Sequence, residues 1–404
     1  MSGLVERRRV VVTGMGTVSA LGCSLAAYRA SLRRCRSGFT GTDHSSEGYV
    51  MGPVRCTIPP VDAALGSPFI AFAVQAAREA VEDAQLQLTP ELSPRVAVVL
   101  GSANGGDGAR ELAWERRAAG VRPHPQTVLR VMTNAAVGAI SMQLSITGPA
   151  LTISTACASG AHAIGQAFRM VQHGEADVAL AGGSEELPGL TTTKAWEQMR
   201  VLSRSICRPF ARERDGLTLA EGAGVLVLET LSGALERGAP IYAEIAGFTM
   251  GADACDWLNA DCSGLVRCMQ GALADAGLGA AELGYINAHA TGTVRGDAVE
   301  AEALRELLGG TPVPVSSTKA LHGHAIGASG ALEAIASILA VKESWLPGMP
   351  VTDAEEGLGL RLVWQAGDEP EYADVAAVLS NSFAFGGLNA SLVFRRASDW
   401  TAQR

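Results

Sequence analysis

A short apolar run followed by a glycine-rich loop occurs twice in this chain, once in each half. Residues 96–100 are wholly apolar and lead into the loop 101–106, and residues 375–379 lead in the same way into 380–387. Uninterrupted apolar runs of this length are typical of strands buried on both faces of a sheet. The repetition therefore predicts two related halves, each built around a buried sheet.

Helix-period segments alternate with the strand-like runs, which favours an α/β architecture. Apolar residues recur every four positions in 69–84, so a helix is predicted there. A strand is predicted at 9–13, ending at Gly14. A new strand-like segment begins after residue 238. We therefore divide the chain into an N-terminal half, 1–238, and a C-terminal half, 239–404.

Composition excludes several classes of function for the 404 residues. The net charge of −9 argues against nucleic acid as the main partner, and no long uncharged apolar stretch predicts a membrane span. With no signal-peptide pattern, the chain is expected to be cytoplasmic. The eight cysteines form no CxxC pair, so we predict no metal site and expect most of them to be small buried thiols.

Cys157 stands in the most informative segment, residues 151–160. A short β run precedes it, and a helix is predicted from Gly160 to Gly174. A cysteine at such a strand-to-helix turn lies near unpaired helical N–H groups, which stabilise a thiolate. The segment alone is equally consistent with a structural cysteine buried in a tight junction.

Two of the seven histidines, His289 and His324, follow predicted strands in loops rich in Gly and Thr. Catalytic groups in α/β folds often stand at such strand ends. A neutral imidazole can donate a hydrogen bond to a developing enolate or move a proton near neutral pH. The alternative is that each histidine has only a structural role, in which its ring is hydrogen-bonded to neighbouring residues. His322 lies two positions from His324 and could face away from any site.

Polar residues near the two histidines complete the candidate site. Lys319 could place a fixed positive charge near the site, with Glu333 on the following helix as its partner. The hydroxyls of Thr291 and Thr293 could hold an amide-rich arm by hydrogen bonds.

Taken together, these segments resemble the β-ketoacyl-acyl-carrier-protein synthases of types I and II and the ketosynthases of type II polyketide and polyene systems. The resemblance covers nearly the whole chain and implies the thiolase-like fold, in which two related α/β halves form five αβαβα layers. The matching segments, in chain order, are 10–22, 155–160, 208–210, 214–216, 221–224, 287–289, 296–297, 317–319, 323–324, 380–383, 385–387 and Asn389.

The resemblance also assigns roles to individual residues. Cys157 would accept the acyl chain as a thioester, and its backbone N–H would form an oxyanion hole with that of Phe385. His289 and His324 would bind the malonyl thioester and promote its decarboxylation, and Lys319 would organise the site with Glu333.

Further roles concern the substrate arm and the partners. Thr291 and Thr293 would contact phosphopantetheine, while Phe385 would act as a gate on the glycine-rich loop, supported by Phe383 and Gly386. No cofactor of the chain's own is implied, because the pantetheine arm belongs to the acyl carrier protein. The partners implied are that carrier protein and a second subunit, either identical or resembling a chain-length factor.

Departures from the family pattern concern the substrate. Ala384 stands where Gly is common, Ala290 follows His289, and His322 takes a position often held by Thr. These differences favour a ketosynthase of specialised polyketide or polyene biosynthesis over a fatty acid enzyme. The alternatives are a non-condensing acyltransferase and a subunit that only sets chain length. The retained Cys157 argues against the second of these.

Overall fold

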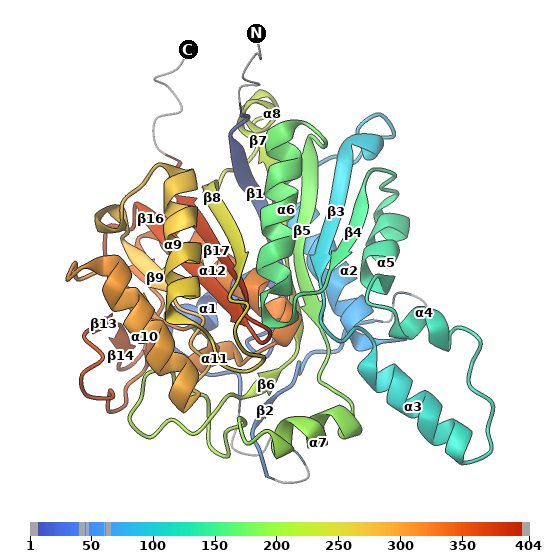
Figure 1. Ribbon diagram of the computed structural model, residues 1–404. Coiled ribbons are helices and arrows are strands. Elements are labelled where there is room, and N and C mark those ends of the chain that lie inside the picture. Colours follow the sequence, from blue (N-terminus) through green and yellow to red (C-terminus); the bar gives the residue numbers. More distant parts are fainter. Residues whose placement is uncertain (1–6, 40–44, 46–47, 60, 62–65, 398–404) are drawn as a thin grey trace.

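The computed structural model describes residues 7–39, 45, 48–59, 61 and 66–397. One hydrogen-bonded sheet runs through the described chain in the order β13-β10-β9-β16-β17-β8-β1-β7-β5-β3-β4. Figure 1 shows the strands of the N-terminal half on one side and those of the C-terminal half on the other. The α/β architecture with two related halves is confirmed, whereas the division at residue 238 stays a prediction.

The N-terminal half contributes five strands of this sheet. They are β1 (Val10–Ser19), β3 (Val96–Gly101), β4 (Ala150–Ile153), β5 (Val178–Glu185) and β7 (Gly222–Thr230). Helices α2 (Pro68–Asp83) and α5 (Ala135–Leu144) pack on one face of it, and α6 (Ser159–His173) packs on the other.

The C-terminal half repeats this arrangement with six strands. They are β8 (Ala243–Ala252), β9 (Tyr285–Asn287), β10 (Pro314–Ser316), β13 (Arg361–Leu362), β16 (Ala377–Ala384) and β17 (Leu388–Arg395). Helix α9 (Cys262–Ala276), with α10 (Val294–Leu308) beside it, covers the outer face, and α12 (Ser329–Glu343) covers the inner face.

The two halves meet through α6 and α12, which pack against each other between the strands of both halves. The layers are therefore α2 with α5, the N-terminal strands, α6 with α12, the C-terminal strands, and α9 with α10. Ser329 to Val341 of α12 is buried without interruption, as expected for a helix with no solvent face. Residues Val10 to Val12 of β1 also pair with Ala243 to Ile245 of β8, which joins the two sets of strands into one ladder.

Smaller elements connect these layers. The helices are α1 (Leu25–Arg33), α3 (Asp107–Ala118), α4 (Thr127–Val131), α7 (Leu190–Gln198), α8 (Leu231–Glu236) and α11 (Lys319–His322), with 3₁₀ turns η2 (Ser93–Arg95), η3 (Ala156–Ala158), η4 (Ala280–Glu282) and η5 (Ile326–Ala328). The short strands are β2 (Met51–Gly52), β6 (Leu219–Ala220), β11 (Trp345–Leu346), β12 (Met349–Pro350), β14 (Trp364–Gln365) and β15 (Glu371–Tyr372). Helices α3 and α4 project from the body of the molecule (Figure 1).

The prediction that the first strand ends at Gly14 is wrong, because β1 continues to Ser19. A register shift between Val12 and Gly14 lets the ladder with β7 go on. A Cβ atom on Gly14 would collide with the backbone of α2 at Ala80. This glycine therefore permits close packing of helix on strand and does not mark a turn.

The cysteines only partly match the expectation of buried thiols. Cys157, Cys207 and Cys268 are buried and free, but Cys23 and Cys56 are joined in a disulfide. Within the described residues, no helix is long and apolar enough to cross a membrane. The same part of the chain holds no group of three or more His, Cys, Asp or Glu placed to bind a metal ion.

Candidate active site

Cys157 lies in the turn η3 between β4 and α6, as the sequence predicts. Its neighbour Ala156 has a φ of 48°, a conformation that is uncommon for a residue other than glycine. The turn is held by the Ser159 hydroxyl, which accepts from the amide of Thr155 at 2.8 Å and donates to the carbonyl of Ala156 at 2.7 Å. The chain thus turns sharply and points the thiol toward the C-terminal half.

His324 comes from that other half and meets the thiol directly. Its Nε2 lies 3.0 Å from Sγ of Cys157, and its Nδ1 lies 2.8 Å from Oγ of Ser329, at the start of α12. The backbone of His324 is fixed beside β6, because its amide donates to the carbonyl of Thr218 at 2.7 Å and its carbonyl accepts from Ala220 at 3.0 Å.

His289 follows β9 and faces His324 edge to face, with ring centroids 5.6 Å apart. Nζ of Lys319 lies 3.3 Å from Nδ1 of His289, and the same ammonium forms a fully buried ion pair with Glu333. The loop that carries His289 is tied to Glu300, whose carboxylate accepts from the backbone amides of His289 at 2.9 Å and Ala290 at 2.7 Å.

Burial keeps both imidazoles neutral. The pKa values of His289 and His324 lie well below the ordinary value because burial, and next the charge of Lys319, disfavour protonation. An ammonium can only donate, so Nδ1 of His289 is the acceptor and Nε2 carries the proton. His289 therefore presents a fixed donor to the site. The hydroxyl of Ser329 can donate or accept, so His324 is free to adopt either tautomer.

The thiol itself is held mostly protonated at rest. Burial raises the pKa of Cys157 to about 11, against the lowering effects of Lys319 and of the backbone amides of Phe385 and of Cys157 itself. These two amides reach the sulfur and are the pair expected to form an oxyanion hole. A thiol of this kind needs a base at the moment of attack, and Nε2 of His324 is within reach.

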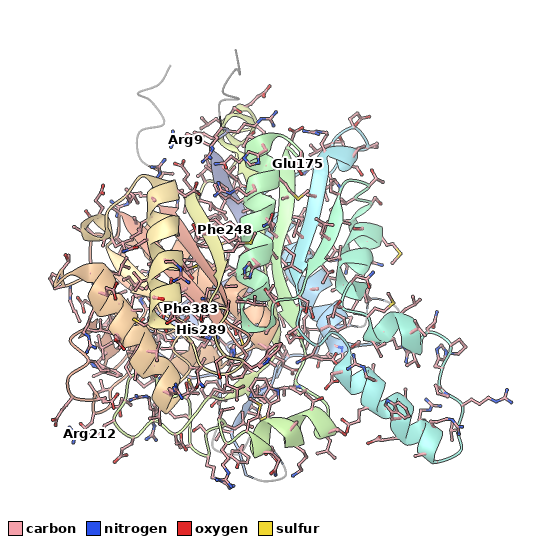
Figure 2. The ribbon with its side chains drawn as sticks, in the orientation of Figure 1. Arg9, Glu175, Arg212, Phe248, His289 and Phe383 are labelled. Atoms are coloured by element: carbon pink, nitrogen blue, oxygen red, sulfur yellow. A yellow bond between two sulfur atoms is a disulfide. The ribbon has the colours of Figure 1, made fainter. Side chains whose placement is uncertain are left out.

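Phe385 covers the site from the turn between β16 and β17. Its ring stacks on that of Trp196 from α7, with centroids 5.8 Å apart. The next residue, Gly386, donates its amide to the carbonyl of Trp257 at 2.8 Å. Phe383 is buried at the end of β16, 6.2 Å from His289 between ring centroids, and Figure 2 shows these two side chains close together.

A cavity of about 290 Å³ opens onto these groups. Cys157, His289, His324, Thr291, Thr293 and Phe385 are among its lining residues. Thr291 and Thr293 stand on one wall with their hydroxyls 3.2 Å apart. Each hydroxyl can donate to or accept from a polar group that enters the cavity.

The structure thus brings every candidate residue from the sequence into or against one site. Lys319, Glu333 and Gly386 lie just behind the lining, and His322 turns away toward Thr318 and the carbonyl of Gly323. Sequence reasoning missed Ser329, Glu300 and Trp196. Ser329 and Glu300 stand five and eleven residues after the two histidines, but nothing in the sequence links Trp196 to Phe385.

Comparison with known proteins identifies the family to which the chain belongs. The family model described as "Beta-ketoacyl synthase, N-terminal domain" matches residues 7–234, and the corresponding C-terminal model matches residues 242–352. The chain belongs to the β-ketoacyl synthase family. Within that family it is a condensing acyltransferase of the 3-oxoacyl-acyl-carrier-protein synthase 2 type, as the following relatives indicate.

Two curated relatives align over almost their full lengths. Nodulation protein E of Rhizobium sp. (strain N33) is 37% identical over 409 residues, covering 96% of this chain and 99% of that protein. 3-Oxoacyl-acyl-carrier-protein synthase 2 of Vibrio cholerae serotype O1 is 35% identical over 419 residues, covering 97% and 100%.

Solved structures agree with this placement. The ishigamide ketosynthase/chain length factor superposes with a TM-score of 0.91 at 32% identity, covering 97% of this chain and all of that one. A type II polyketide acyl-carrier protein in complex with its ketosynthase gives a TM-score of 0.87 at 26% identity, covering 97% of this chain and all of that one. The thiolase-like fold implied by the sequence resemblance is thus confirmed.

Proposed function

We propose that this enzyme extends a carrier-bound acyl chain by two carbons through decarboxylative Claisen condensation with malonyl carrier protein, in a specialised polyketide or polyene pathway. The observation that carries the chemistry is the contact of His324 with Cys157 beside the fixed donor His289. The pathway is supported by the similarity to the ishigamide ketosynthase/chain length factor. The departures at Ala384 and His322 from the common pattern point the same way.

Acyl transfer comes first in the proposed reaction. Sγ of Cys157 attacks the carbonyl carbon of the acyl thioester while its proton passes to Nε2 of His324. The negative charge on the carbonyl oxygen is held by the backbone N–H groups of Cys157 and Phe385, each worth about 3 kcal/mol in such a hole. When the tetrahedral intermediate collapses, the pantetheine thiolate leaves and takes the proton back from His324.

Condensation follows on the acylated enzyme. The malonyl thioester carbonyl accepts hydrogen bonds from Nε2 of His289 and of His324, so that carbon dioxide can leave and the electron pair form an enolate. The enolate carbon attacks the Cys157 thioester, the new carbon–carbon bond forms, and the sulfur departs as thiolate. Lys319 and Glu333 act behind His289 by fixing its tautomer. Thr291 and Thr293 hold the pantetheine arm.

A second subunit is part of the proposal. Among the described residues, β4 is the last strand of the sheet and has one unpaired edge, and Leu151 on it is 49% exposed. Exposed apolar side chains continue over the neighbouring helices, at Leu112, Trp114, Val128, Leu129 and Met142. Such a surface favours coverage by another chain, either identical or similar to a chain-length factor. Native mass spectrometry of the purified chain alone distinguishes a homodimer from a monomer that awaits its partner.

Intact-protein mass spectrometry with acyl and malonyl carrier proteins tests the chemistry. Wild-type enzyme should gain the acyl mass, and a carrier product longer by two carbons should then appear. Cys157→Ala should show neither, whereas Cys268→Ala, which removes a buried free thiol outside the cavity lining, should show both. Acylation without extension would favour a simple acyltransferase, and absence of any adduct would favour a chain-length-setting subunit.

A further inference from the structure

The turn that carries Cys157 has a counterpart in the C-terminal half. Residues 156–161 read Ala-Cys-Ala-Ser-Gly-Ala, and residues 326–331 read Ile-Gly-Ala-Ser-Gly-Ala. Each stretch forms a 3₁₀ turn, η3 or η5, followed by a helix of 15 residues. The first residue of each turn has a positive φ, 48° at Ala156 and 42° at Ile326. Gly327 therefore occupies the position that corresponds to Cys157.

A buried carboxylate fills the second turn. The amide of Gly327 donates to Oε2 of Glu185 at 3.1 Å. The same carboxylate accepts from the amides of Ala103 at 2.7 Å and Asn104 at 3.0 Å, and from the hydroxyl of Ser102 at 3.2 Å. A Cβ atom on Gly327 would collide with this carboxylate and with the amide of Ala103.

The position of Glu185 links it to both reacting side chains. It ends β5 in the N-terminal half, whereas Gly327 belongs to the C-terminal half, and the turns η3 and η5 pack against each other. Two residues after Gly327 comes Ser329, whose hydroxyl bonds Nδ1 of His324. A shift of η5 relative to β5 would therefore move His324 relative to Cys157.

We propose that Glu185 is a positioning residue for the condensation, holding η5 against residues 102–104 of the loop after β3 so that His324 stays within reach of Cys157. The inference rests on the proposed function for its kinetic consequence. Glu185 touches neither the thiol nor the cavity, so it acts through the four donors that it binds and through its charge. A fully buried carboxylate with four donors is costly to disturb, because each donor left unpaired destabilises the native arrangement.

Glu186 provides a matched control. It is the next residue, is also buried, and accepts from the hydroxyl of Ser67 at 2.6 Å and the amide of Gly108 at 2.9 Å. These partners lead into α2 and α3 and not into either turn. Glu185→Gln and Glu186→Gln thus make the same substitution at similar burial, but only the first should disturb the reacting pair.

The kinetic test compares decarboxylation of malonyl carrier protein by the folded variants. Glu185→Gln should lower kcat by about tenfold or more with KM nearly unchanged, while Glu186→Gln should leave kcat within about twofold of wild type. Glu185→Asp, which keeps the charge and shortens the side chain, should recover part of the loss. Equal kcat values for folded Glu185→Gln and Glu186→Gln would overturn the proposal.

A second readout needs no acyl substrate. Burial raises the pKa of the Cys157 thiol and the charge of Glu185 adds to this rise, while Lys319 opposes it. In Glu185→Gln the midpoint of alkylation of Cys157 by iodoacetamide should move to lower pH, and in Glu186→Gln it should not. An unmoved midpoint in folded Glu185→Gln would count against coupling between the residues. This result is separable from failure of the proposed function, which would appear as absence of condensation by wild type.

Discussion

Nε2 of His324 lies 3.0 Å from Sγ of Cys157 although the two residues are 167 positions apart in the chain. The opposite nitrogen of the ring is bonded to the hydroxyl of Ser329, which can donate or accept. That adaptability suits a histidine that must take up the thiol proton in one step and donate a hydrogen bond in the next. His289 has no such freedom, because the ammonium of Lys319 fixes its tautomer.

Ser329→Ala should therefore slow acylation of Cys157. With the hydroxyl gone, Nδ1 of His324 loses its partner inside a buried site, and the expected loss of about 1–2 kcal/mol corresponds to about 5- to 30-fold in rate. Rapid-quench measurement of the acyl-enzyme gives this rate. Ser337→Ala, which removes a buried hydroxyl bonded only to the backbone of α12, is the control, and an equal rate in both variants would contradict the assignment.

The buried pair Lys319–Glu333 should behave differently when one or both partners are removed. Lys319→Met leaves the carboxylate without its cation, so we expect a loss of about 3–5 kcal/mol in the free energy of unfolding. Replacing both residues by Met should restore most of that stability without restoring condensation, because Nδ1 of His289 still lacks its donor. Denaturant titrations of the single and double variants measure the first effect, and single-turnover condensation measures the second. A double variant as unstable as the single one would show that the charge is not the cause.

His322 should make the fold less stable in mild acid. Burial, and next the charge of Lys319, lower its pKa to about 3, whereas in the unfolded chain it is near 6.5. Between these values the unfolded state binds more protons, so stability is fully present above about pH 6.5 and falls as pH decreases, by up to about 1.4 kcal/mol per unit. His322→Thr should reduce the loss measured by urea unfolding between pH 7 and pH 5. A loss that stays the same in His322→Thr would contradict this assignment.

Trp196 should control access to Cys157. The thiol is only 4% exposed, and Phe385 stacks on Trp196 beside it. Loss of an aromatic pair worth about 0.5–1.5 kcal/mol should let Phe385 leave its place more often, so Trp196→Ala should speed alkylation of Cys157 by up to about tenfold. The rate of iodoacetamide labelling, followed by peptide mass spectrometry, measures this. Tyr372→Ala on β15, at a side chain 60% exposed, should not change the rate.

The disulfide between Cys23 and Cys56 should make stability depend on reductant. It joins the start of α1 to the segment after β2 and closes a loop of 33 residues, for which loop entropy predicts about 3–4 kcal/mol of stabilisation. The midpoint of unfolding in urea should fall when dithiothreitol is added, and Cys23→Ser/Cys56→Ser should match the reduced protein. Peptide mapping without reduction locates the bond. If the midpoint of unfolding were the same with and without dithiothreitol, these cysteines would not be joined in solution.

Features that depend only on neighbouring residues in the chain could be predicted from the sequence. Successive side chains of a strand point to opposite faces, so a run without polar residues indicates a strand that is buried on both faces. Residues 96–100 form such a strand. Cys157, His289 and His324 stand in short motifs whose residues favour a strand followed by a tight turn, and this preference depends only on neighbouring residues. The repeat of strand and glycine-rich loop predicted two halves, but the loop predicted at 380–387 is wrong in its first part, because β16 runs from Ala377 to Ala384 and is paired with β17 along its whole length.

Only the tertiary structure decided which groups face each other. Ser329 is one of many serines in the sequence, and its role appears because η5 places it against His324. The stacking of Trp196 on Phe385, the disulfide and the four donors around Glu185 all join segments far apart in the chain. Sequence periodicity carries information about the face of one element, whereas these contacts depend on how two halves close on each other. The sequence alone determined the residue types, the two halves and the chemistry they allow, and tertiary packing decided which partners hold them in place.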